Sequence, residues 1–184
     1  MKKQVLKLDL DDYCDDSQNL AYIFFHTTVP GYAFVDDLNH LYRLTLRRLD
    51  DLTIEGQPWP LYTYHDQLQK LDYYLIERPS GATNNISHWS QGHKMMIIKG
   101  ELAMEAATRI SDEFVTPLPP PDKCNPMEAE RFDILASYQQ AFTPVTLYDM
   151  NPPTTASKKT LKERVELEKI FTTILDLLDL SAIE

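Results

Sequence analysis

The chain has 184 residues, of which 43% are hydrophobic and 25% are charged; this composition favours one globular domain with a sizeable core and excludes a disordered or collagen-like chain. The formal net charge is −10, from 28 acidic and 18 basic residues, which argues against nucleic acid and anionic membranes as partners because both are negatively charged. No run of about 18 apolar residues occurs, so no transmembrane helix is expected.

Cysteine usage and the N-terminal segment favour a cytoplasmic protein. Cys14 and Cys124 lie far apart in the sequence, and two thiols make neither a disulfide framework nor a four-ligand zinc site. The segment MKKQVLKLDLDD turns acidic where a signal peptide would have its apolar region. We therefore expect a reducing compartment.

The first part of the chain changes repeatedly between strand and helix patterns. Alternating apolar residues predict a strand over Val5–Leu10, and an aromatic and β-branched run predicts a buried strand over Ala21–Thr27. Apolar residues then recur at helical spacing over Tyr32–Tyr42. Alternation returns over Leu44–Leu49, which indicates another strand.

The middle of the chain is expected to be rich in strands. Pro58 and Pro60 are predicted to break the chain before the strand Leu61–Tyr64. The segment Asp72–Glu77 follows a polar turn, and the two segments together predict an antiparallel hairpin with a longer loop. A further strand is predicted over Lys94–Lys99, after a polar loop.

Helices and proline dominate the next part. High helix propensity predicts a helix over Glu101–Arg109 and a second over Met127–Ala141. Four prolines within Pro117–Pro121 predict an extended spacer between them. The last strand is predicted over Phe142–Tyr148, and Pro144 favours an edge position because proline cannot donate a ladder hydrogen bond.

The C-terminal segment Ser157–Leu180 is predicted to be one long helix with an apolar stripe. Such a helix must bury its stripe, either against its own sheet or against a second copy of the chain. The candidate interface residues are Leu167, Phe171, Ile174 and Leu178.

Strands cluster between the helices instead of alternating with them. This order predicts an α+β fold, with a mainly antiparallel sheet, helices packed on one face and a C-terminal amphipathic helix. We expect one domain over residues 1–150, followed by a linker and helix over residues 151–184.

Several short segments, in this order, resemble a bacterial family known as IPExxxVDY. The resemblance spans roughly residues 5 to 161 and is carried by Leu6-Lys7-Leu8-Asp9, Leu49-Asp50-Asp51-Leu52, Tyr62-Thr63-Tyr64-His65-Asp66, Asp72-Tyr73-Tyr74-Leu75-Ile76, Ile97-Ile98-Lys99-Gly100 and Ser157-Lys158-Lys159. The signature itself is not kept, because the matching window, Ile86–Lys94, shares only its isoleucine. The resemblance implies a cytoplasmic bacterial protein without an assigned activity, and it supplies no catalytic residues.

No metal site is expected from the acidic residues or the histidines. The acidic run Asp9–Asp16 lacks the glycine and the late glutamate of a calcium loop, which favours a solvated turn. The five histidines do not have the spacing of a zinc site; they are His26, His40, His65, His88 and His93.

No catalytic residue or cofactor site is expected either. The chain has no glycine-rich phosphate loop and no nucleophile elbow. Cys14 precedes two aspartates, and their negative charge opposes formation of a thiolate.

The densest polar group of the sequence comprises two arginines, an aspartate and two tyrosines. If their two strands are neighbours, the arginine and tyrosine donors converge on one face and bind a small anion or an acidic peptide. The alternative is a cross-strand ion-pair network that contributes little to stability. The candidate ligand-binding residues are Arg47, Arg48, Asp50, Tyr62 and Tyr64.

Two functions therefore remain open. The first is a non-enzymatic binding or adaptor domain whose partner is another protein or a second copy of the chain, which the apolar C-terminal helix favours. The second is a small-molecule-binding regulatory domain, or an enzyme of unrecognised type, that uses the region of Arg48 and Tyr64.

Overall fold

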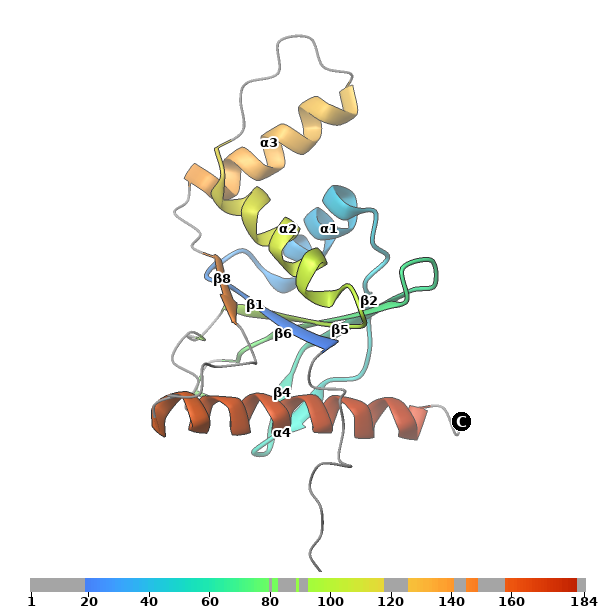
Figure 1. The fold of residues 1–184 in the computed structure, drawn as a ribbon, viewed down its shortest axis with the longest axis vertical. Helices are drawn as coiled ribbons and strands as arrows, with labels where there is room; N and C mark the ends of the chain where they lie inside the picture. The colour runs from blue at the N-terminus through green and yellow to red at the C-terminus, as the bar shows by residue number, and fades with distance from the viewer. Residues whose placement is uncertain are drawn as a thin grey trace, which may run out of the picture.

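The computed structural model describes residues 19–79, 81–82, 89, 93–117, 126–140, 145–148 and 158–181. Within these ranges, six strands form one antiparallel sheet in the order β2-β5-β6-β7-β1-β8 (Figure 1). The strands of this sheet are β1 (Leu20–Phe25), β2 (Arg47–Arg48), β5 (Leu61–Asp66), β6 (Leu71–Glu77), β7 (Lys94–Lys99) and β8 (Val145–Tyr148).

Helices α1 (Gly31–Tyr42) and α2 (Ala103–Val115) lie on one face of the sheet, and α3 (Pro126–Gln140) packs on these two helices (Figure 1). Helix α1 turns Phe34, Leu38 and Leu41 inward at intervals of three and four residues, which is the spacing of one helical face. The core between α1 and the sheet includes an edge-to-face aromatic contact between Phe25 and Phe34, whose ring centroids lie 4.9 Å apart.

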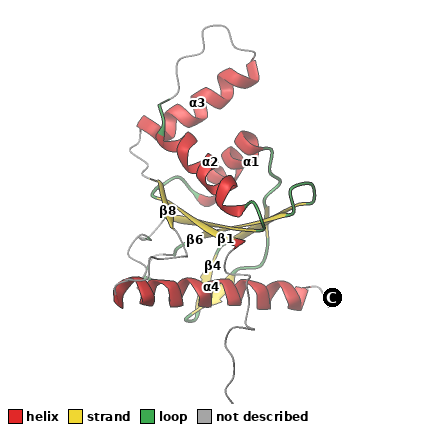
Figure 2. Ribbon diagram, in the orientation of Figure 1, coloured by secondary structure: helices red, strands yellow, loops and turns green. Residues whose placement is uncertain are grey.

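The opposite face is covered by helix α4 (Lys158–Ser181) and a small hairpin of β3 (Leu52–Ile54) and β4 (Gln57–Trp59) (Figure 2). The core on this side includes Trp59 and Trp89, whose rings meet edge to face at 5.0 Å. The sheet therefore lies between two layers, and each layer has its own apolar core. We call the core under α1 and α2 the first core and the core under α4 the second core.

The predicted fold class is confirmed, because the structure is α+β with a mainly antiparallel sheet and a C-terminal helix. The predicted hairpin is confirmed as β5–β6, and the strand Lys94–Lys99 has the predicted bounds. Strand β8 lies at the edge of the sheet, as Pro144 led us to expect. The predicted strand Val5–Leu10 lies outside the described residues, as do residues 118–121 of the proline-rich spacer.

Two sequence predictions were wrong between α1 and β5. The segment Leu44–Leu49 contributes a strand of only two residues, Arg47–Arg48. Pro58 does not break the chain but lies within β4, where it stands opposite Thr53. A proline is tolerated there because a two-stranded sheet consists only of edge strands.

Helix α4 packs on the sheet of its own chain. Leu167 and Ile174 are fully buried in the second core, whereas Phe171 and Leu178 are partly buried against it. The Phe171 ring lies 6.1 Å from the Tyr74 ring in an edge-to-face contact. These contacts bury the apolar stripe of α4 against the sheet of its own chain.

None of the helices in the described ranges combines the length and the apolar character that a bilayer crossing requires.

Candidate functional site

The predicted arginine and tyrosine group is divided between the two faces of the sheet. Arg47 stands opposite Thr63 in β5, and Arg48 stands opposite Tyr62. Because successive residues of a strand point to opposite faces, the two arginines do not converge on one site. Asp50 is exposed.

Arg48 is engaged by neighbouring side chains. Its Nη1 atom donates to the Tyr62 hydroxyl at 3.1 Å, its guanidinium pairs with Asp51, and its Cζ atom lies 5.1 Å from the centre of the Tyr62 ring. Tyr64 lies further along β5 and stacks on Tyr73 at 6.0 Å. Arg48 and Tyr62 are therefore in contact, whereas Tyr64 belongs to a separate aromatic pair.

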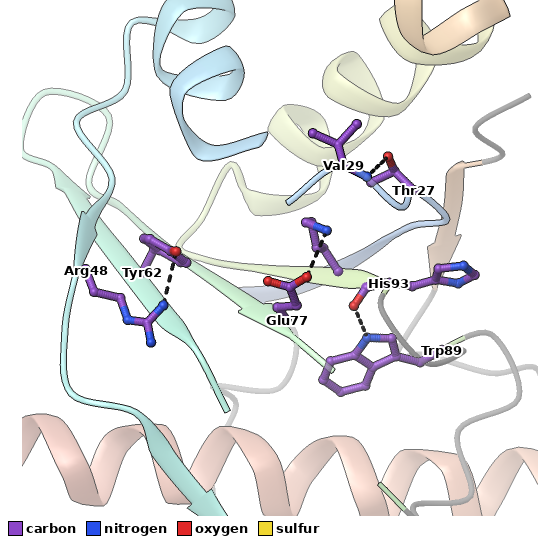
Figure 3. A network of polar contacts seen from close by, with 8 residues as sticks. Thr27, Val29, Arg48, Tyr62, Glu77, Trp89 and His93 are labelled. Carbon is purple, nitrogen blue, oxygen red and sulfur yellow. Dashed lines mark hydrogen bonds and ion pairs between the residues drawn. The ribbon is translucent and has the colours of Figure 1, made fainter. Parts of the chain in front are cut away.

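A buried ion pair lies on the same face, near one end of the sheet (Figure 3). Glu77 ends β6 and Lys94 begins β7, and the two stand directly opposite each other in the antiparallel register. The Nζ atom of Lys94 lies 3.3 Å from Oε1 of Glu77, and the Lys94 side chain is 0% exposed. Burial lowers the pKa of Lys94, and the Glu77 carboxylate opposes that shift.

The start of α1 completes this cluster. A β-carbon on Gly31 would overlap Oε2 of Glu77 and would lie 3.6 Å from the Tyr62 hydroxyl. Glycine at this position therefore lets the carboxylate approach the first turn of α1, where the helix dipole favours negative charge. The arrangement ties α1 to strands β5, β6 and β7. A substrate has no access to the fully buried Lys94 amine, so this geometry fits anchoring better than catalysis.

A histidine pair lies at the ends of β1 and β7. The Nδ1 atoms of His26 and His93 are 3.0 Å apart, and Nε2 of His26 lies 3.3 Å from Oγ1 of Thr146 in β8. Burial lowers the pKa of His93, and the charges of His26, Lys94 and Arg78 lower it further.

Neighbouring polar contacts hold Ala82, Trp89 and His93, which precede β7. The Trp89 indole donates from Nε1 to the backbone oxygen of His93 at 3.0 Å (Figure 3). Buried Arg78 donates to the backbone oxygens of Trp89 and Ala82. Arg78 therefore ties Ala82 and Trp89 to the end of β6.

Metal-ligating side chains do not gather within the described ranges, where no group of three or more could hold a metal ion. His40 lies 3.4 Å from Glu130, and His65 lies 2.6 Å from Asp72, each as an isolated pair. His88, Cys14, Cys124 and the acidic run Asp9–Asp16 lie outside the described residues.

A hollow of about 570 Å³ opens on the other side of the molecule, between α4 and the β3–β4 hairpin. A second hollow of about 350 Å³ shares Val165 and Glu166 with it and continues along α4 to Leu161. We call both together the α4 groove; its lining residues are Thr53, Ile54, Glu55, Leu161, Lys162, Val165, Glu166, Glu168, Lys169, Ile170, Thr172 and Thr173.

No protein-family model, curated protein or solved structure matches this chain. The resemblance to the IPExxxVDY family therefore stays a prediction.

Sequence reasoning missed the Glu77–Lys94 pair and the His26–His93 pair. Each pair joins residues at the ends of two strands, so only the sheet register brings the partners together. The available signal was a charged residue at each end of an apolar strand, as in Lys94–Lys99. A charged residue at each end of a strand does not indicate which of the two residues is buried in the folded protein.

Proposed function

We propose that this chain is a non-enzymatic protein-binding domain that takes an apolar segment with basic flanks into the α4 groove. The observation that carries the proposal is the exposure of Leu161 and Val165, which are 50% and 49% exposed one helical turn apart. Glu163 lies between them in sequence but is only 4% exposed, so Leu161 and Val165 lie on the outer side of the helix and Glu163 on the inner side. This end of α4 thus presents aliphatic side chains to the outside, as a docking surface does.

The charge of the α4 groove supports a basic partner. Three glutamates and two lysines line the groove, which leaves a net negative charge of one: Glu55, Glu166, Glu168, Lys162 and Lys169. The net charge of the whole chain has the same sign, at −10. Complementary charge speeds association and disfavours wrong partners. A second copy of the chain would bring the same negative charges, and nucleic acid would bring phosphates, so both are weaker candidates.

The contacts of Arg48 favour this proposal over a small-molecule site in the Arg48 and Tyr64 region. The Arg48 guanidinium already donates to Tyr62 and pairs with Asp51. A ligand there would have to displace both partners.

Selection from a displayed library of random peptides tests the proposal. We expect enriched peptides to combine aliphatic residues with lysine or arginine. The aliphatic residues would contact Leu161 and Val165, and the basic residues would complement the glutamates of the groove. Val165→Glu should abolish their binding, since it places a carboxylate in the apolar contact. Leu68→Glu is the matched control, because Leu68 is 96% exposed in the turn between β5 and β6.

Peptides that bind the Val165→Glu variant and the wild type equally would refute the groove as the site. Sedimentation of the wild type and of Val165→Glu completes the test. A wild-type dimer that the substitution dissociates would assign the groove to a second copy and overturn the proposal of a basic partner.

A further inference from the structure

Three arginines, one directly after α1 and one each in α2 and α3, line one small pocket on the α1–α3 side of the sheet. Arg43 follows the end of α1, Arg109 lies in α2 and Arg131 lies in α3. The pocket has a volume of about 220 Å³, and its other lining residues are Leu41, Tyr42 and Glu113. Three positive charges and one negative charge meet there, in a chain whose net charge is −10.

Only one of the three arginines is engaged in the structure of the helix layer. Arg131 donates to the backbone oxygen of Leu41 and pairs with Glu113, and its Cζ atom lies 5.6 Å from the centre of the Tyr42 ring. It therefore caps the end of α1, where a cation interacts favourably with the helix dipole.

The other two arginines have donors to spare. Arg43 is exposed and makes a contact of 3.6 Å from Nη2 to the sulfur of Met127, which is a weak acceptor. Arg109 is exposed and makes no hydrogen bond or ion pair with any residue in the described ranges. Glu113 lines the same pocket, and Glu105 and Asp112 line the hollow beside it, but none of these carboxylates forms an ion pair with Arg109.

Tyr42 lines the same pocket with its ring. Its hydroxyl is buried and lies near Glu113 without completing a hydrogen bond of standard geometry. Burial raises the pKa of Tyr42, and the charge of Glu113 raises it further, so the phenol stays protonated. The pocket therefore offers guanidinium donors around a space with a positive net charge, and Tyr42 forms part of its wall.

We infer that this pocket binds the phosphate group of a small phosphate monoester. Planar guanidinium groups match the oxygens of phosphate in pairs, and a dianion neutralises the excess of two positive charges. The pocket lies in the α1–α3 layer, whereas the α4 groove lies on the other side of the sheet. The inference is thus independent of the proposed function and adds a small-molecule site to it.

Calorimetric titration of the full chain with inorganic phosphate and with phenyl phosphate tests the inference, at constant ionic strength set with chloride. We expect both to bind, and phenyl phosphate at least as tightly as inorganic phosphate. Arg109→Gln should weaken binding of each by about tenfold or more, because it removes a charge-assisted hydrogen bond. Arg47→Gln is the matched control, since Arg47 is an exposed arginine of the sheet edge.

A second variant keeps the test decisive if Arg109→Gln does not fold. Arg43 has a φ of 54°, a conformation that asparagine tolerates well, so Arg43→Asn removes the charge without backbone strain. The inference is overturned if phosphate gives no heat of binding beyond chloride, or if these variants bind as the wild type does. A phosphoserine peptide that binds more tightly than phenyl phosphate would also overturn it, in favour of a macromolecular ligand.

Discussion

The two sides of the sheet differ in which elements their polar contacts join. On the α1–α3 side, polar contacts join separate elements: Tyr138 of α3 donates to Asp37 of α1, and Lys94 of β7 pairs with Glu77 of β6. On the α4 side, the ion pairs Arg164–Glu168 and Lys169–Glu166 each join two residues of the helix itself.

This difference indicates that α4 is attached chiefly by apolar burial. Leu167, Ile170 and Ile174 are at most 2% exposed. The dipole of α4 does not help, because its first turn has no acidic residue and its last turn has no basic residue. The helix layer combines apolar packing with polar ties between its elements, whereas α4 is attached mainly by its buried aliphatic side chains and by Phe171, which contacts Tyr74 and Lys99.

The largest expected effect is that of removing α4. A chain ending at residue 157 loses three fully buried aliphatic side chains, worth about 1.5–3 kcal/mol each, which approaches the total stability of a typical domain. We expect the truncated protein to unfold or aggregate near room temperature, as measured by circular dichroism and light scattering.

Ile174→Ala is the graded version of the same experiment. It should lower the free energy of unfolding by about 2–5 kcal/mol in urea titrations, because a cavity remains in the second core. A truncated protein that keeps the wild-type Tm would show that the sheet does not need this cover.

The buried ion pair on the other face should give a smaller effect. Glu77→Gln removes the carboxylate beside the buried Lys94 amine and should cost about 1–3 kcal/mol. The double variant Glu77→Gln/Lys94→Met should be more stable than Glu77→Gln alone, because it leaves no buried charge without its counter-ion. Glu168→Gln serves as the control, since that pair is exposed and should contribute at most about 1 kcal/mol. If the separate effects of Glu77→Gln and Lys94→Met on the free energy of unfolding add up in the double variant, the two side chains are not coupled and this prediction is wrong.

The smallest expected effect concerns the histidine pair. The pKa of His93 is lower in the folded protein than in the unfolded chain. Below the unfolded value of about 6.5 the unfolded state therefore binds more protons, so this group makes the protein less stable as the pH falls. Asparagine cannot titrate, so the difference in Tm between wild type and His93→Asn should shrink or reverse on acidification. A difference independent of pH would exclude His93 as the source, and His65→Asn controls for the loss of an exposed histidine.

Local patterns were sufficient to predict most elements of the fold. The strand over Lys94–Lys99 and the helix over Met127–Ala141 rest on alternation and helix propensity, and both appear with nearly the same bounds. The hairpin of β3 and β4 was missed because Pro58 was interpreted as a chain break. Proline is compatible with an edge strand, but a rule based on propensity alone does not take the position of a strand into account.

The candidate sites were much less predictable, because they depend on register and on packing between distant elements. Arg47 and Arg48 are neighbours in sequence but lie on different faces of the sheet. Arg43, Arg109 and Arg131 are scattered in sequence and meet only because α1, α2 and α3 pack together. Leu161 and Val165 belong to the apolar pattern of α4, but their exposure follows from which side of the helix meets the sheet.

The position of β1 has a consequence for how the chain folds during synthesis. All six residues of β1 are buried, and its neighbours in the sheet are β7 and β8. The ribosome therefore releases the segment LAYIFF long before either partner strand exists. Until then it is an apolar run of high β-propensity with unpaired edges, which is the type of segment that aggregates. The local hairpin β5–β6 can form early, whereas closure of the sheet around β1 must wait for contacts of high sequence separation and is expected to limit the folding rate.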